Sequence, residues 1–446
     1  MPPTGRRLFA DFAYLLTGHG FVRLVSFVAS LYVAKALGPA EFGALSLGLA
    51  LAVMFGVCAN LGLDDLLVRE VARDPAGGAT LLGDAIVLKL LALPAGVLGA
   101  LGLTLARPQD GALYLFLLLY ATCFSYLLIV CAICRGHQRM ALQSLLLGAN
   151  VLLMAGAAAG AAHLTGRAAA VAGGYALAAA GVLGAGYVVL RRLRALPRFD
   201  WRPARWLAVL RTALPFAATL FGLLVFDRLA LVTITAVLGH TATGWFSAAA
   251  NIVLGLTTLP GLAVAAVYPL LARTAGERRA KGGATAAVVA PLVLFVAGSG
   301  LALAAALVLL APVVVPRVFG TAYLPSVAVL QALAPGLPCL FLVVALTSVL
   351  EAIDRQRAGA AAVGSGLLVA APLCVVATQR WGIVGAAVAY DVCYTLLAGI
   401  TLALVVSAVG GRHLWAAIRR WPPFFPAETR PAARPVLHLD GHARSS

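Results

Sequence analysis

Charged residues are scarce in this sequence. Asp, Glu, Lys and Arg make up 11% of its 446 residues, whereas soluble domains carry about 25%. Because 62% of the residues are hydrophobic, we predict an all-α integral membrane protein rather than a soluble domain. Acidic residues are rarer than basic ones, 16 against 33, which gives a formal net charge of +17. In a membrane protein such cations mostly mark orientation, so no nucleic-acid partner is expected.

Sequence motifs of enzymes and of metal or nucleotide sites are missing as well. The seven histidines lie at segment ends, in loops or in the tail, with no carboxylate at the spacing of a metal site or catalytic triad. No glycine-rich loop precedes Lys-Ser or Lys-Thr, which excludes a P-loop for ATP. Cys131 and Cys134 are a single close pair, too few thiolates for a zinc site. We therefore expect no enzyme, no cofactor and no metal.

Long apolar stretches, broken at Gly, Pro and charge clusters, dominate the rest of the sequence. A helix of about 20 apolar residues crosses a hydrocarbon core of about 30 Å. The segment from Arg23 to Arg73 holds two such stretches separated by Gly38-Pro39, which predicts a transmembrane hairpin. In all we predict twelve transmembrane helices, near residues 10–37, 42–63, 81–106, 112–134, 141–162, 168–190, 213–238, 243–271, 284–310, 323–350, 358–378 and 383–407.

The positions of Lys and Arg predict how these helices are oriented. Of the 33 cations, 25 lie in segments on the side of the N-terminus and five lie in turns on the opposite side. Only Arg23, Lys89 and Arg228 lie within helices. Since cytoplasmic loops carry the excess of Lys and Arg, we expect both termini in the cytoplasm, with the protein in a bacterial inner membrane.

The two halves of the chain resemble each other. Aligning Gly38 with Gly239 also pairs Gly43 with Gly244, and pairs two serines three residues further on. Parallel repeats of six helices predict two lobes related by a pseudo-two-fold axis along the membrane normal, with a cavity between them. The predicted domains are an N-terminal lobe (1–190), a basic cytoplasmic linker (191–212), a C-terminal lobe (213–411) and a partly disordered cytoplasmic tail (412–446).

Six ionisable residues fall inside the predicted helices. A charge at the centre of a bilayer costs about 2.5–3.5 kcal/mol on insertion scales, so each of them should face the interior of the bundle. They either pair with one another or bind a substrate or an ion. When the two halves are aligned, Arg228 lies one helical turn from the position that corresponds to Arg23. The full set is Arg23, Asp84, Lys89, Asp227, Arg228 and Asp391.

Several short motifs resemble those of a known family. They are LGPAEFG with Ser46, LVREVAR, the stretch from Phe226 to Gly261, and FGTAYLPSVAVLQALAP with Arg355-Gln356-Arg357 further on. With these motifs, most of the chain resembles the polysaccharide-repeat exporters, which are O-antigen-type flippases of the multidrug/oligosaccharidyl-lipid/polysaccharide superfamily. Relatives frequently carry a basic residue after Tyr/Phe-Ser-Ala-Ala. This chain departs from that pattern, because it has Asn251 near that place.

The resemblance implies a flippase for a polyprenyl-pyrophosphate-linked oligosaccharide, moved from the cytoplasmic to the outer leaflet for polysaccharide biosynthesis. Fixed cations would then replace the hydration of the pyrophosphate, and the expected substrate-binding residues are Arg23, Lys89, Arg228 and Asn60. Asp391 and Asp227 are the candidates for coupling to H+ or Na+; alternatively, Asp391 is a static partner of a buried cation. The expected partners are the lipid-linked saccharide, the bilayer, and glycosyltransferases or a polymerase of the same pathway.

Two alternatives stay open. A drug or metabolite antiporter on the same fold would prefer an acidic site for cationic substrates, and the three cations within helices argue against it. A membrane-embedded saccharide polymerase would need a large extracytoplasmic loop with polar catalytic residues, whereas all predicted outer turns are short.

Overall fold

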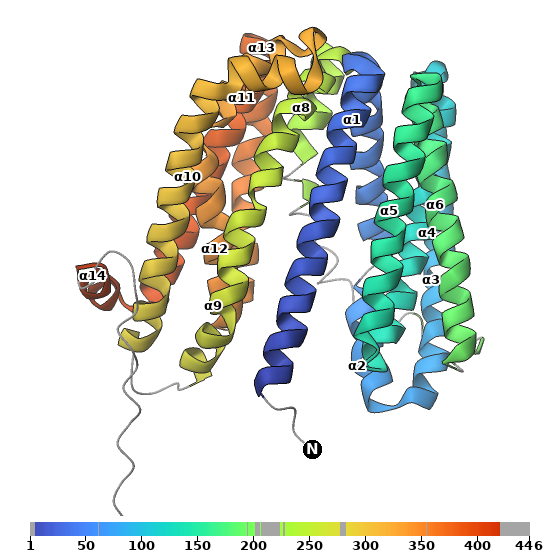
Figure 1. Cartoon of the computed structure of the whole chain (residues 1–446), viewed down its shortest axis with the longest axis horizontal. Coiled ribbons are helices and arrows are strands. Elements are labelled where there is room, and N and C mark those ends of the chain that lie inside the picture. The colour runs from blue at the N-terminus through green and yellow to red at the C-terminus, as the bar shows by residue number, and fades with distance from the viewer. Residues whose placement is uncertain are drawn as a thin grey trace, which may run out of the picture.

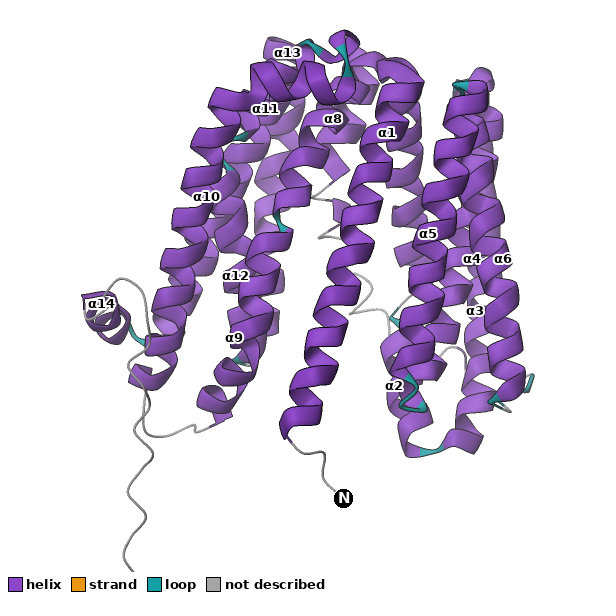
Figure 2. Ribbon diagram, in the orientation of Figure 1, coloured by secondary structure: helices purple, strands orange, loops and turns teal. Residues whose placement is uncertain are grey.

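A computed structural model of the protein describes residues 5–60, 62–193, 195–200, 206, 224–225, 228–276, 282–353 and 355–419. The side chains of residues 5–23, Arg23 included, and of some residues elsewhere lie outside this description. Long helices running side by side make up nearly all of the described chain, as Figures 1 and 2 show. The predicted all-α membrane fold is confirmed.

The N-terminal half forms a bundle of six limbs, meaning stretches that each cross the bundle once. α1 (Gly5–Asn60) supplies two of them, because Gly38 adopts φ 74° and ψ 171° and breaks the helix just before Pro39. Glycine reaches a positive φ without the steric cost that a Cβ would add. The first limb rises from the N-terminus and the second descends beside it (Figure 1). The other four limbs are α3 (Pro75–Ala106), α4 (Gly111–Gly136), α5 (Met140–Thr165) and α6 (Ala168–Arg192).

The C-terminal half repeats this arrangement. The helical segment Arg228–Leu238 leads to Gly239, whose φ of 85° and ψ of −176° resemble those of Gly38. Gly382 divides α13 into two limbs in the same way. The other helices are α8 (His240–Leu256) with α9 (Thr258–Gly276), α10 (Gly282–Phe319), the pair α11 (Pro325–Leu333) and α12 (Leu337–Ala352), which is bent by 50°, and α13 (Gln356–Val409). The described residues thus give twelve limbs in two lobes, as predicted.

We call the face with the turns at Gly38, Gly239 and Gly382 the upper face, and the face where α1 begins the lower face, as in Figure 1. Two short 3-10 helices lie between the third and fourth limbs of the lobes at the upper face, η1 (Pro108–Asp110) and η2 (Thr321–Tyr323). α10 continues to the upper face, nine residues beyond the predicted end at residue 310. The prolines within it do not end the helix, because neighbouring helices can satisfy the freed carbonyls.

Two amphipathic helices at the lower face were not predicted. α2 (Leu63–Arg73) buries Leu63, Leu67 and Val71, spaced four residues apart, and exposes its arginines. α14 (Gly411–Arg419) buries Leu414 and lies beside the lower end of α10 (Figure 1). Both stretches are charged, and charge clusters were interpreted as the ends of transmembrane helices.

The described part of the predicted linker 191–212 packs on the N-terminal lobe. The Arg198 N–H donates to the Ala79 carbonyl (2.9 Å), and the Trp206 indole N–H donates to the buried Asp84 carboxylate (2.9 Å). The rest of the linker and residues 420–446 of the predicted tail lie outside the described residues. The four domain boundaries therefore stay predictions.

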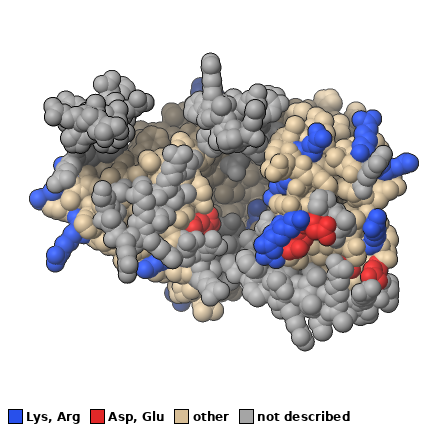
Figure 3. Space-filling view, turned by 90° about the horizontal axis from the view of Figure 1, so that it is seen from below, with Lys and Arg blue, Asp and Glu red and all other residues tan. Residues whose placement is uncertain are grey.

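The lobes meet in their upper halves and diverge toward the lower face (Figure 1). A Cβ on Gly43 would collide with the carbonyl oxygen of His240, and a Cβ on Gly244 would collide with that of Pro39. In the alignment of the halves Gly43 corresponds to Gly244 and Pro39 to His240, so each contact is the equivalent of the other. The two contacts therefore lie on either side of the pseudo-two-fold axis. Seen from below, the molecule is hollowed between the lobes, as Figure 3 shows. The structure is thus closed at the upper face and open toward the lower one.

Candidate functional site

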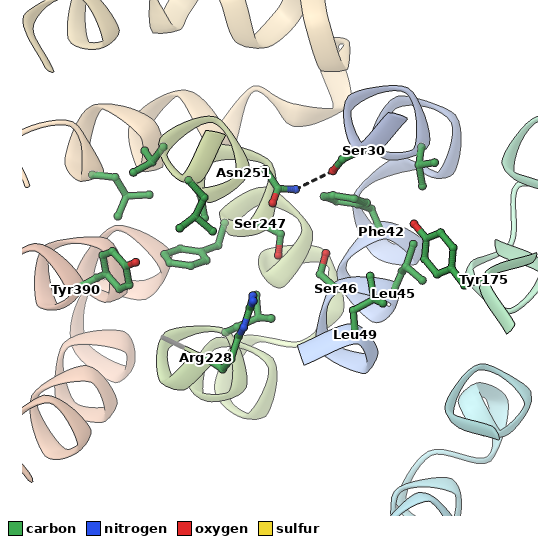
Figure 4. Close-up of a pocket in the computed structure, with 17 residues that line it drawn as sticks. Ser30, Phe42, Leu45, Ser46, Leu49, Tyr175, Arg228, Ser247, Asn251 and Tyr390 are labelled. Atoms are coloured by element: carbon green, nitrogen blue, oxygen red, sulfur yellow. Dashed lines mark hydrogen bonds between the residues drawn. The ribbon is translucent and has the colours of Figure 1, made fainter. Parts of the chain in front are cut away.

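A cavity lies between the lobes, below the contact at the upper face. It holds about 890 Å³ of space free of protein atoms, its open mouth included. α1 lines one side, while α8, the segment Arg228–Leu238 and α13 line the other (Figure 4). Tyr175 of α6 and Tyr390 of α13 lie at opposite ends. Both lobes therefore contribute to one site, as the repeat predicted.

Hydroxyl and amide groups give the cavity a polar wall. Ser46 and Ser247, paired by the alignment of the halves, face each other from the two lobes (Figure 4). The Asn251 amide donates to the Ser30 hydroxyl across the interface at 3.1 Å. Among the described lining residues there is no carboxylate. The described lining thus offers hydroxyl, amide and guanidinium groups.

Arg228 is the cation among the described residues that line this cavity. It lies ten residues before Leu238, or about 15 Å below the upper face at 1.5 Å per residue, and its guanidinium points inward (Figure 4). Its Nε is buried and has no hydrogen-bond partner among the described residues, and the same holds for the Ser247 hydroxyl. Buried polar atoms are normally paired, so these two atoms are candidates for binding a ligand.

Lys89 and Asn60 lie elsewhere, in a buried network of the N-terminal lobe. The Lys89 ammonium donates to the Ser125 carbonyl (2.7 Å) and hydroxyl (2.8 Å), and it lies 3.9 Å from the Asp64 carboxylate. The Asn60 amide donates to that carboxylate at 2.7 Å. The structure thus brings these two predicted residues together, but with each other and not with Arg228. The Lys89 side chain is only 2% exposed.

Asp391 interacts with the backbone at the bend between α11 and α12. Its Oδ2 accepts a hydrogen bond from the Gly336 N–H at 2.8 Å. This bond caps the first turn of α12 and gives the carboxylate a partner that is not a cation. The other coupling candidate, Asp227, lies outside the described residues, and so does the side chain of Arg23. Their predicted roles stay untested.

Some residues of the site were missed because their signal lies in the repeat. Tyr175 and Tyr390 are each the eighth residue of an equivalent limb, counted from Ala168 and Ile383. Extending the alignment to the last limb of each lobe would have paired them. The aromatic stacks Tyr120–Tyr175 and Tyr390–Tyr394, with ring centroids 5.8 and 4.6 Å apart, hold both tyrosines in place.

Comparison with known proteins assigns a family to this architecture. The family model for "Polysaccharide biosynthesis protein" matches residues 8–275, more than half of the chain. The chain belongs to this family. A search of curated proteins finds no match.

Solved structures agree with the fold. A lipid II flippase MurJ in an inward closed conformation is 14% identical, with 91% of each chain covered and a TM-score of 0.74. A multidrug resistance transporter of the MATE family and MOP superfamily, inward-facing, is 15% identical over 88% of this chain and 98% of its own, with a TM-score of 0.69. An outward-facing structure of such a transporter has a TM-score of 0.58, at 15% identity over 91% of this chain and 96% of its own. These likenesses show that the chain has the multi-pass membrane fold that these flippases and transporters share.

Proposed function

We propose that this protein flips a polyprenyl-pyrophosphate-linked oligosaccharide from the cytoplasmic to the outer leaflet of a bacterial inner membrane. The observation that carries the proposal is Arg228, a half-buried arginine whose buried Nε has no partner among the described residues, in a cavity whose described lining has no carboxylate. A guanidinium offers a planar fork of donors that matches phosphate oxygens.

The cavity suits the different parts of such a substrate. Arg228 and the hydroxyls of Ser46 and Ser247 would hold the pyrophosphate, which could not cross hydrocarbon unaided. Arg23 would add a second cation from the first limb of α1. The sugars would lie in the open part of the cavity, and the lipid tail would extend between helices into the bilayer. Lys89 would support the N-terminal lobe and act on the substrate only if its network opened.

The lower face would be cytoplasmic. This orientation is supported by the 25 cations predicted on the side of the N-terminus against five on the other. The TM-score is higher with the inward-facing MATE structure, 0.69, than with the outward-facing one, 0.58. Since this chain opens at its lower face, the higher score supports a cytoplasmic lower face. The substrate would enter from the cytoplasm, and release would require the lobes to close below and separate above.

A drug or metabolite antiporter is the alternative function, since MATE transporters share the fold. The described lining lacks the acidic group that a cationic drug would need, which favours the flippase. Asp391 and Asp227 remain the proposed sites for a coupling ion.

A flipping assay tests the proposal. The protein would be placed in vesicles with a polyprenyl-pyrophosphate oligosaccharide whose sugar carries a fluorophore, and a membrane-impermeant reductant would report its exposure. We expect faster exposure than in protein-free vesicles and no transport of a cationic dye. Transport of the dye, with the lipid moving no faster than in protein-free vesicles, would replace the flippase by the antiporter.

A further inference from the structure

A second polar cluster lies outside the cavity, at the upper face where the lobes meet. His240, the first residue of α8, belongs to the C-terminal lobe. In the N-terminal lobe, Arg107 directly precedes η1 and Asp110 is the last residue of η1. The His240 Nε2 lies 2.6 Å from the Arg107 Nη1 and 2.9 Å from the Asp110 Oδ2. The side chains of His240 and Asp110 are 16% and 15% exposed. We call these three residues the His240 cluster.

The equivalent contact on the other side of the pseudo-two-fold axis has different chemistry. There η2 reaches across to the N-terminal lobe, and the Tyr323 hydroxyl donates to the Ala34 carbonyl of α1 at 2.6 Å. The residue that aligns with His240 is Pro39, whose side chain has no hydrogen-bonding group. Each lobe thus places its 3-10 helix against the other lobe, but only the contact at η1 combines a histidine with a carboxylate.

One ring nitrogen of His240, Nε2, lies close to one hydrogen-bond donor and one acceptor. Arg107 can only donate a hydrogen bond, and an ionised Asp110 can only accept one. The Nε2 of His240 therefore satisfies Arg107 when it carries a lone pair and Asp110 when it carries a proton. The other ring nitrogen, Nδ1, is buried without a hydrogen-bond partner among the described residues. Protonation of the neutral tautomer that carries its hydrogen on Nδ1 would therefore move the hydrogen bond of Nε2 from Arg107 to Asp110.

We propose that the His240 cluster is a proton-binding site through which the pH at the upper face controls the closure of the lobes. A proton taken from water at this face binds the neutral imidazole, and the imidazolium then donates to Asp110 as an ion pair between lobes. Arg107, which is half-buried, turns toward solvent and leaves the ion pair intact. Histidine ordinarily changes charge between about pH 5 and 8, so acid at the upper face favours the closed state.

The neighbouring titratable groups leave this role to His240. Glu41 of α1 accepts a hydrogen bond from the Ala168 N–H within the N-terminal lobe (2.6 Å). Tyr114 of α4 and Tyr323 of η2 stay neutral over this range, because phenols titrate near pH 10 or above.

The proton would regulate transport without driving it. The cluster lies at the upper face, so the proton arrives from and returns to the same aqueous phase. Binding of the proton shifts the equilibrium between the closed and open states, and this shift does not depend on which substrate is carried. The proposal is therefore independent of the proposed function. Asp110→Asn removes the attraction and leaves the repulsion by Arg107, so this variant is expected to reverse the pH response.

Distance measurements between spin labels test the proposal. Cysteines would replace the exposed Leu177 of α6 and Leu324 beside η2, in a protein with the exposed Cys58 changed to Ser. Double electron–electron resonance would then give the ratio of closed to open upper faces at pH 5.5 and pH 8. We expect this ratio to rise by about two- to fivefold in acid, the range for a partly exposed ion pair.

Variants and a matched control decide the outcome. His240→Gln should abolish the response, Asp110→Asn should reverse it, and Arg107→Gln should enlarge it. His163→Gln is the control, because His163 is also near the upper face but bonds Tyr32 within its own lobe. An unchanged response in His240→Gln, or equal responses in Arg107→Gln and His163→Gln, would overturn the proposal. Arg107→Gln keeps the test decisive if Asp110→Asn does not fold.

Discussion

Lys89 of the N-terminal lobe and Arg228 of the C-terminal lobe are both cations within membrane-crossing helices, the first buried and the second half-buried, and their surroundings differ. Lys89 is held by Ser125 and Asp64 inside one lobe. Arg228 faces the cavity between the lobes, and its Nε has no partner among the described residues. Burial of a charge alone therefore does not mark a binding site. A binding cation also needs an accessible volume and donors that the protein leaves unused.

The largest expected effect is a loss of stability when Lys89 is removed. Lys89→Met removes the ammonium that lies 3.9 Å from the buried Asp64 carboxylate, and breaking a buried ion pair in this way should cost about 3–5 kcal/mol of unfolding free energy. Thermal unfolding in detergent and the abundance in membranes would measure this loss.

Two variants sharpen this result. Asp64→Asn combined with Lys89→Met should recover most of the stability, because both charges are gone. Lys35→Met is the matched control, since Lys35 of α1 is exposed, and its unfolding temperature should not change. If Lys89→Met were as stable as Lys35→Met but could not transport, Lys89 would belong to the substrate site, as the sequence predicted.

Arg228 should show the opposite behaviour, with transport lost and stability kept. A hydrogen bond to a charged group contributes about 1.5–3 kcal/mol, so Arg228→Ala should slow flipping by about 10- to 150-fold. Arg228→Lys should recover part of the rate, since a point charge replaces a fork. The vesicle assay measures both variants at equal protein amounts.

The control for Arg228 is Arg317, an exposed arginine near the upper end of α10. Arg317→Ala should flip at the normal rate. A normal rate in Arg228→Ala as well would remove Arg228 from the site and leave Arg23 as the remaining arginine candidate.

Much of the fold could be predicted from local signals. Gly38 and Gly239 break helices through positive φ values, and such breaks are visible in the sequence as Gly-Pro or Gly-polar pairs between apolar runs. The alignment of the halves also paired Gly43 with Gly244, and the structure places each of them against the backbone of the other lobe. α2 and α14 were missed because amphipathic surface helices are rich in the same charges that end transmembrane helices.

The site was harder to predict because its pairings are distant in sequence. No acidic residue lies one helical turn from Lys89 in the sequence, and its partner Asp64 lies 25 residues earlier, near the start of α2. His240 and Asp110 are 130 residues apart. Helical periodicity reveals neighbours on one helix only, so contacts between helices and between lobes need the folded structure.

Asp391 gives the smallest expected change in stability and extends the comparison to a half-buried acidic residue. An amide oxygen can accept the Gly336 N–H as well as a carboxylate can, so Asp391→Asn should keep the unfolding free energy within about 0.5 kcal/mol. Asp391→Leu leaves that N–H unsatisfied and should lose about 1–3 kcal/mol. Because the cap alone does not require an ionisable group, we expect Asp391→Asn to lose the response of flipping to an imposed pH or sodium gradient. If the Asn variant responds like the unmodified protein, Asp391 serves only to cap α12, and the membrane potential acting on the bound anion becomes the proposed energy source.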